Sequence, residues 1–141
     1  MIIRHADTAA EIARCHPLMR QLRPHLESAS QFLEIYRRQA VAGYRLLVRW
    51  SGETPVALAG YRLSENLIHG PHLYVDDLVS DSASRNSGHG GALLEFLKAE
   101  AKALGCDQLV LDTGIGNLNA QRFYQNVGLA AEGVHFYVKL S

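Results

Sequence analysis

A glycine-rich run is the part of this sequence best suited to chemistry. It reads Arg85-Asn86-Ser87-Gly88-His89-Gly90-Gly91 and leads into a helical pattern. Glycines leave backbone N–H groups uncovered by side chains. At the start of a helix such groups bind anions, because they lack partners and the helix dipole favours negative charge there. Arg85 adds a cation at the mouth of the run, so the sequence predicts a phosphate-binding loop.

The spacing of the glycines separates the kinds of phosphate-binding loop. The pattern Gly-x-x-x-x-Gly-Lys-Ser/Thr does not occur, which excludes a P-loop. The Gly-x-Gly-x-x-Gly pattern of dinucleotide-binding folds fits poorly, because the run here is Gly88-x-Gly90-Gly91. The spacing that matches is Arg-x-x-Gly-x-Gly. A glycine-rich turn before a helix is often only a surface turn, so the rest of the chain must support the interpretation.

Two acidic residues, Asp76 and Asp77, stand just before this loop, inside the apolar segment 72–80 that reads as a strand. In a regular strand, neighbouring side chains point to opposite faces. Either carboxylate could act as a general base, directly or through water. The alternative is structural: an aspartate at a strand end that satisfies neighbouring amides or an arginine.

The elements that must position these residues follow from hydrophobic periodicity. After the glycines, apolar residues recur on one helical face as far as Leu104, and Gly105 is a suitable C-terminal cap. The strands at 72–80 and 108–112 flank this helix, and a right-handed crossover would make them parallel. Before these elements we expect a strand at Ile2-Ile3 and two helices opened by capping boxes, one at Thr8/Glu11 with a break at Pro17 and one at Ser28/Gln31 that ends at Gly43. Strands at 44–50 and 55–63 and a loop over 64–71 should follow. After the strand at 108–112 we expect a short helix capped by Asn117 and a last strand at 136–140.

Composition limits the classes of partner. The 141 residues fit one domain, and Lys plus Arg equals Asp plus Glu at 14 each, so no global field attracts nucleic acid or an anionic membrane. No apolar segment is long enough to span a bilayer, and none resembles a signal peptide. Cys15 and Cys106 lack metal spacing, which favours buried free thiols in a reducing, cytoplasmic setting. His69 and His72 lack a third ligand, so no metal is expected.

Two motifs together strongly resemble the GNAT superfamily of N-acetyltransferases, of the bacterial type whose substrate is uncharacterised. One is Arg85-x-x-Gly88-x-Gly90 after Tyr74-Val-Asp-Asp-Leu-Val79, and the other is Asn117-x-x-Ala120-x-x-Phe123-Tyr124. The resemblance covers nearly the whole chain and implies a single GNAT N-acetyltransferase domain over residues 1–141. The implied fold is α/β (α+β), with a mixed central sheet, parallel and splayed fourth and fifth strands, and helices on both faces.

The resemblance also implies a reaction. Acetyl-CoA would be the co-substrate, without a metal, and its acetyl group would pass to a primary amine by direct attack in a ternary complex. Tyr124 would protonate the departing thiolate, and Asp76 or Asp77 would assist loss of the amine proton. Backbone N–H groups of the strand would polarise the thioester carbonyl. The cofactor-binding residues would be Leu78, Val79, Ser80, Arg85, Asn86, Ser87, Gly88, His89, Gly90, Gly91, Asn117 and Tyr124.

Some alternatives remain open at the level of sequence. A non-catalytic acyl-CoA-binding module, acting as a sensor or a partner subunit, would share the loop, and a different nucleotide-binding α/β domain is a more remote choice. Retention of Tyr124 and the paired aspartates favours the enzyme. The acceptor could be a small molecule or a peptide: polyamine, amino sugar, amino acid, peptide N-terminus or lysine. Family habit and the free edge of the expected last strand imply a homodimer.

Overall fold

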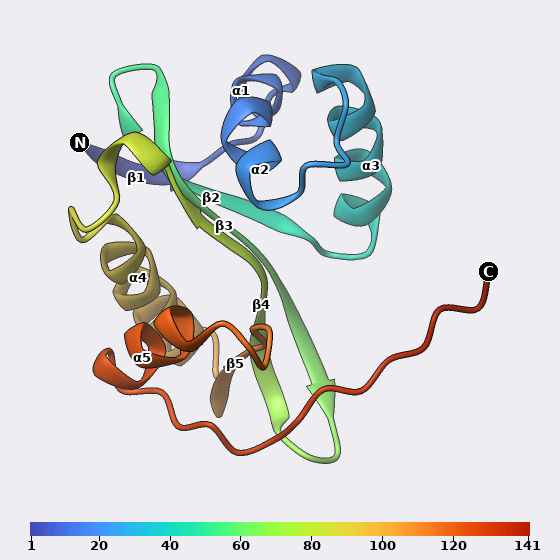
Figure 1. Ribbon diagram of the computed structural model, residues 1–141, viewed down its shortest axis with the longest axis vertical. Coiled ribbons are helices and arrows are strands. Elements are labelled where there is room, and N and C mark those ends of the chain that lie inside the picture. Colours follow the sequence, from blue (N-terminus) through green and yellow to red (C-terminus); the bar gives the residue numbers. More distant parts are fainter. The chain divides into compact units, whose positions relative to one another are not determined.

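A mixed five-stranded sheet, in the order β1-β2-β3-β4-β5, runs through the protein (Figure 1). The computed structural model describes residues 1–141 in two compact units, Met1–Val110 and Leu111–Ser141. Strands β1 to β4 pair antiparallel, and β5 is parallel to β4, which confirms the predicted fold class. The elements are β1 (Ile2–His5), α1 (Ala9–Arg14), α2 (His16–Leu22), α3 (Ala29–Val41), β2 (Arg45–Ser51), β3 (Thr54–Asn66), β4 (Gly70–Ser80), the 3₁₀ turn η1 (Ser82–Ser84), α4 (His89–Ala103), β5 (Gln108–Leu111) and α5 (Leu118–Asn126).

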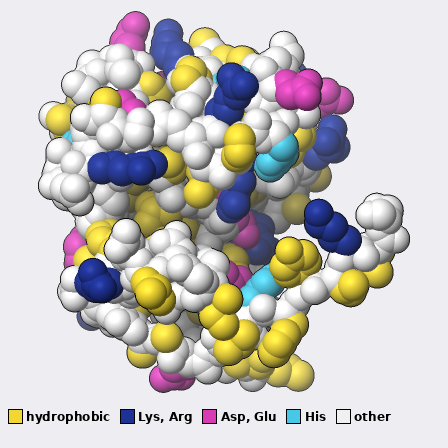
Figure 2. All heavy atoms as spheres, viewed as in Figure 1, with side chains coloured by type: hydrophobic (Ala, Val, Ile, Leu, Met, Phe, Trp, Pro, Cys, Tyr) yellow, Lys and Arg dark blue, Asp and Glu magenta, His cyan; other side chains and the backbone are white.

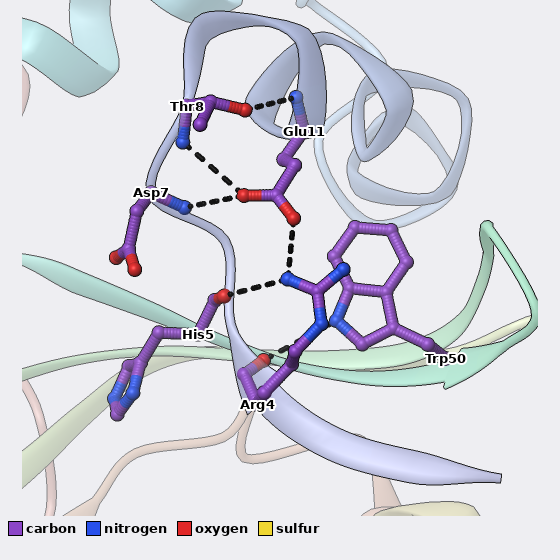
Figure 3. Close-up of polar contacts among 6 residues, drawn as sticks. All are labelled: Arg4, His5, Asp7, Thr8, Glu11 and Trp50. Atoms are coloured by element: carbon purple, nitrogen blue, oxygen red, sulfur yellow. Dashed lines mark hydrogen bonds and ion pairs between the residues drawn. The ribbon is translucent and has the colours of Figure 1, made fainter.

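The first helix begins with the predicted capping box, drawn in Figure 3. Thr8 Oγ1 accepts a hydrogen bond from Glu11 N at 3.2 Å, and Glu11 Oε1 accepts from the backbone N–H groups of Asp7 and Thr8 at 3.2 and 3.3 Å. The other Glu11 oxygen pairs with Arg4, whose guanidinium lies 4.5 Å from the centre of the Trp50 ring. The start of α1 is therefore tied to β1 and β2 by charge as well as by its cap.

The other helix boundaries in this region also follow local signals. The helical run breaks between α1 and α2 with Pro17 in the first turn of the second piece, as predicted. Ser28 Oγ accepts from Gln31 N at 3.1 Å, but Gln31 Oε1 accepts from Glu27 N at 2.6 Å rather than from the cap residue, so the second box is only half formed. Gly43, with φ +101°, follows α3 as its terminator.

The sheet buries side chains on both faces. On one face Leu46, Val48, Trp50 and Leu58 form a core cluster together with residues of α1, α2 and α3, such as Ile12. The alternate strand residues are buried against the other face, where α4 contacts β3 and β4 (Figure 1). That helix contributes Leu93, Leu94 and Leu97, all fully buried. The chain between β4 and α4 must therefore pass from one layer of the molecule to the next.

The predicted loop over 64–71 is wrong, because both strands extend through it. β3 runs to Asn66 and β4 begins at Gly70, and Asn66 pairs with Gly70 in the ladder. The turn is closed by Asn66 Oδ1, which accepts from His69 N at 2.7 Å, and by Gly70 at φ +64°. The polar composition suggested a loop, but backbone pairing in a two-stranded ribbon does not need an apolar face.

The second unit holds the capped helix α5 and an extended tail. Asn117 Oδ1 accepts from Ala120 N at 3.1 Å, as expected of a helix cap. The predicted last strand at 136–140 is wrong: the chain after α5 forms no helix or strand, and Phe136, Tyr137 and Val138 are exposed. Alternation supplies an apolar face, but a strand also requires a neighbour that accepts and donates its backbone hydrogen bonds. None of the helices is both long and apolar enough to cross a membrane.

Candidate functional site

The glycine-rich loop connects β4 and η1 to the N-terminus of α4. Gly88 is the N-cap residue with φ +76°, a left-handed conformation that glycine adopts at little cost, and Asn86 has φ +69°. No side chain caps the helix, and a Cβ built on Gly88 would meet nothing within 4 Å. The first N–H groups of α4 therefore have no side-chain acceptor, and the space beside Gly88 is open. This arrangement fits a phosphate group.

Two arginines lie near this helix end, one exposed and one partly buried. Arg85 is exposed in the loop. Arg49 of β2 donates from Nη1 to His89 Nδ1 at 3.0 Å, so the ring proton of a neutral His89 is on Nε2. His89 is buried, with only 5% of the residue exposed, so its ring is not free to face solvent in the loop. The Nε of Arg49 is buried and without a partner, so its charge is held beside the N-terminus of α4.

Both aspartates of β4 lie on the same cavity, because the strand is irregular at this point. Gly60 of β3 pairs with Asp77 and the next residue, Tyr61, pairs with Val75, so Asp76 is an extra residue in the ladder. Such a β-bulge changes the alternation of side chains. The expectation that the two carboxylates point to opposite faces held only for a regular strand, and the structure corrects it: both line one cavity.

Each of these carboxylates has a guanidinium partner. Arg62 of β3 binds Asp76 with two bonds, from Nε at 2.7 Å and from Nη2 at 2.8 Å. Arg23, which follows α2, donates from Nε to Asp77 Oδ1 at 3.0 Å and from Nη2 to the backbone oxygen of Asp76 at 2.9 Å. The second oxygen of Asp77 accepts from the hydroxyl of Tyr44 at 2.8 Å. All four carboxylate oxygens thus accept a hydrogen bond already.

Tyr44 is placed by the absence of a side chain at Gly60. A Cβ on Gly60 would lie 1.7 Å from the Tyr44 hydroxyl and 2.7 Å from Asp77 Oδ2. Burial of the ring, and then the neighbouring Asp77 carboxylate, raise the pKa of Tyr44 well above its ordinary value. The phenol therefore stays protonated and donates to Asp77 throughout the neutral range. Gly60 is needed for close approach of this side chain rather than for its backbone conformation.

An open cavity of about 410 Å³ lies beside the two aspartates. Its lining comes from the end of α2, from α3 and from the two bulged strands, and consists of Arg23, Gln39, Ala42, Arg62, Asp76 and Asp77. The volume falls within the range of small-ligand sites. Figure 2 shows charged side chains of both signs interspersed over the viewed face of the molecule.

The loop and the cavity are linked through α2. Gln21 of this helix donates from Nε2 to Asp81 Oδ1 at 3.1 Å, and its Oε1 accepts from Ser82 N at 2.9 Å. Asp81 and Ser82 begin the segment that leads into the glycine-rich loop. The same helix precedes Arg23, which holds Asp77. A movement of α2 would therefore shift both the start of the glycine-rich loop and the arginine that binds Asp77.

The structure places the remaining predicted residues, but their predicted roles concern contacts with CoA. Leu78, Val79 and Ser80 end β4, just before the loop, and pair with residues of β3. In the second unit, the Tyr124 ring lies 5.3 Å from that of Phe123, and burial raises the pKa of its phenol. The contacts of these residues and of Asn117 with CoA stay predictions. No three or more His, Cys, Asp and Glu side chains gather so as to hold a metal ion.

Sequence reasoning missed several residues of the cavity. Nothing in the sequence distinguishes Arg23 from the other charges near the first helices, although it forms an ion pair with Asp77 of β4. Arg62 and Gly60 had weak signals, since a charge and a glycine inside an apolar strand pattern are both unusual. Nothing in the sequence pointed to Tyr44, which reads as an ordinary strand aromatic.

The sequence of this chain matches a known protein family. A model of the acetyltransferase (GNAT) family matches residues 8–129. An uncharacterized N-acetyltransferase, YhdJ of Bacillus subtilis (strain 168), is 27% identical over 127 residues, which span 89% of each chain. The aminoglycoside N(6')-acetyltransferase type 1 of Serratia marcescens is 32% identical over 89 residues, which span 60% of this chain and 61% of that one.

Solved structures show the same fold. The aminoglycoside N-acetyltransferase AAC(6')-Iy, solved in complex with CoA, superposes with a TM-score of 0.84 at 18% identity, over 99% of this chain and 95% of that one. At this level of identity the likeness establishes the fold alone. The family match extends from the capping box of α1 to the residues just after α5 and includes both sequence motifs. The chain therefore belongs to the GNAT family of acetyltransferases.

Proposed function

We propose that this protein transfers the acetyl group of acetyl-CoA to a primary amine of a small molecule, by direct attack in a ternary complex. One observation carries the proposal: β4 bears the two aspartates of a ligand-sized cavity and leads, through η1 and the glycine-rich loop, to a helix N-terminus that no side chain caps. The acetyltransferase AAC(6')-Iy, which has the same fold, was solved with CoA. An acceptor and a phosphate-bearing donor could thus be held by neighbouring parts of one strand.

The proposed reaction needs three events. The amine nitrogen attacks the thioester carbonyl carbon, the carbon–sulfur bond breaks, and the amine loses one proton while the CoA thiolate gains one. Backbone N–H groups at Leu78–Ser80 would polarise the carbonyl. Tyr124 would supply the proton to sulfur: burial raises the pKa of its phenol, so the hydroxyl carries its proton at neutral pH and is available as a donor.

Asp76 and Asp77 would receive the amine rather than act as free bases. Each is already ion-paired with a guanidinium, and every carboxylate oxygen already accepts a hydrogen bond. We therefore propose that they orient the ammonium form, and that its proton leaves through water beside them. The base role of either aspartate stays a prediction.

The test of the cofactor site is Gly90→Glu. A carboxylate placed in the first turn of α4 would repel and obstruct a phosphate, so binding of CoA measured by calorimetry should be largely lost while circular dichroism stays unchanged. Gly133→Glu, in the exposed tail where a Cβ meets nothing within 4 Å, is the matched control. Equal affinities for the two variants would refute the assignment of the loop.

The test of the acid is Tyr124→Phe. This change keeps the ring against Phe123, so CoA affinity should survive while kcat falls by about a hundredfold or more, the usual contribution of a general acid. The rate is followed as thiol release from acetyl-CoA over a panel of amines. A kcat within about threefold of the wild type across pH would make Tyr124 a packing residue.

A non-catalytic acyl-CoA-binding module is the second candidate, and the ion pairing of both aspartates is the observation in its favour. It predicts tight CoA binding without thiol release for any amine.

We also propose a homodimer, since apolar residues of the tail are exposed in the single chain (Figure 2). We propose a cytoplasmic location, since both cysteines are free thiols. Light scattering that reports only monomer would count against the dimer.

A further inference from the structure

The charges of the cavity cancel. Two carboxylates, Asp76 and Asp77, face two guanidiniums, Arg23 and Arg62, and no other charged side chain lines the space. Each carboxylate oxygen already accepts at least one bond, from Arg62, Arg23 or Tyr44. The lining of the cavity therefore carries no net charge, although a carboxylate oxygen that accepts one hydrogen bond can still accept a second.

This balance disfavours an acceptor with several ammonium groups. Such a ligand would bring net positive charge next to two guanidiniums whose pairing with Asp76 and Asp77 already balances the charge of both carboxylates. A ligand with one ammonium group and no other charge could bind the aspartates, but it would offer no acceptor to the remaining N–H groups of the arginines.

The arginines retain hydrogen-bond donors for a ligand. A guanidinium has five N–H groups, and Arg62 spends only its Nε and one terminal nitrogen on Asp76. Its side chain remains 41% exposed, and its guanidinium carbon lies 5.2 Å from the centre of the Tyr74 ring, within the range of a cation–π contact. Arg23 is more heavily committed, because it binds the Asp77 side chain and the Asp76 backbone at once.

We propose that the acceptor is an amine that also carries a carboxylate, an amino acid or a short peptide, and that Arg62 binds this carboxylate while the aspartates receive the ammonium group. A ligand with one charge of each sign leaves the cavity neutral and finds a partner for both ends. The inference rests on the proposed acetyl transfer to a small-molecule amine and names its substrate class.

The experiment compares acceptors that differ only in the carboxylate. An amino acid, its carboxamide and the corresponding decarboxylated amine are tested in parallel with a polycationic aminoglycoside. We expect kcat/KM for thiol release to favour the carboxylate by about tenfold or more, the scale of one charge-assisted contact. Calorimetry on the protein saturated with CoA should show the same order of affinities. Carboxamides, decarboxylated amines or aminoglycosides that bind as well as the amino acids would overturn the inference.

Arg62→Gln tests the assigned residue. The preference for the amino acid over its carboxamide should fall by about tenfold, and Arg62→Lys should restore part of it. Because the preference is a ratio within one variant, loss of folded protein does not affect it. Arg38→Gln, which breaks only an exposed pair with Glu34, is the matched control and should keep the preference. An unchanged ratio in Arg62→Gln would overturn the assignment.

The two proposals fail separately. Absence of thiol release with every amine, together with a calorimetric preference for carboxylate, would refute the acetyl transfer and support the binding class. Thiol release without any preference for carboxylate would support the transfer and refute the acceptor class.

Discussion

Replacement of Gly60 by alanine is the sharpest perturbation that the structure offers. The added Cβ would lie 1.7 Å from the Tyr44 hydroxyl and 2.4 Å from the ring carbon that bears it. Both distances are far shorter than a van der Waals contact, and Tyr44 is only 4% exposed, so it has little room to move. The ring must shift and lose its 2.8 Å bond to Asp77.

The magnitude follows from these two consequences. Overpacking of a core costs about 1–3 kcal/mol, and a hydrogen bond to a charged group contributes about 1.5–3 kcal/mol. The unfolded chain loses entropy when glycine becomes alanine, which offsets about 0.4–1 kcal/mol. We therefore expect Gly60→Ala to lower the free energy of unfolding by roughly 2–5 kcal/mol and to raise the KM of the acceptor, since the shifted Tyr44 would no longer hold the Asp77 carboxylate in place.

Urea unfolding followed by circular dichroism measures the stability change. Gly133→Ala is the matched control, because its Cβ meets nothing within 4 Å, and it should stay within about 0.5 kcal/mol of the wild type. In a Tyr44→Ala background, most of the Gly60→Ala effect should vanish, with a coupling energy above about 1 kcal/mol. A loss below about 1 kcal/mol, or the same loss in both backgrounds, would refute the packing argument.

Two further predictions concern groups away from the cavity. The hydrogen bond from Arg4 lowers the pKa of Glu11 from 4.5 to about 2, so its contribution is present above pH 4.5 and is lost as the pH falls toward 2. Urea unfolding of Glu11→Gln should show a deficit of about 1 kcal/mol at pH 7 that disappears near pH 2, and a pH-independent deficit would contradict this. Burial raises the pKa of Cys15 to about 12, so Ellman's reagent at pH 8 should modify partly exposed Cys106 first and Cys15 only after unfolding; equal rates would contradict it.

The sequence alone determined the parts of this protein that depend on neighbours along the chain. The Thr8/Glu11 box, the break at Pro17 and the terminator Gly43 appear in the structure where local chemistry requires them. The strand–loop–helix from β4 to α4 follows in the same way, because glycines and hydrophobic period act over a few residues. These local signals were enough to identify the fold class and the family.

Only the tertiary structure decided how the candidate site is built. The bulge that turns Asp76 to the side of Asp77 is a property of the register between β3 and β4, and a one-residue change in register is invisible in either strand alone. Arg23 and Tyr44 reach Asp77 from positions 54 and 33 residues away in the sequence. The segment 136–140 has the alternation of a strand but no partner for its backbone. Pairing across the chain, and not pattern, therefore decides which carboxylates meet which cations and which segments become strands.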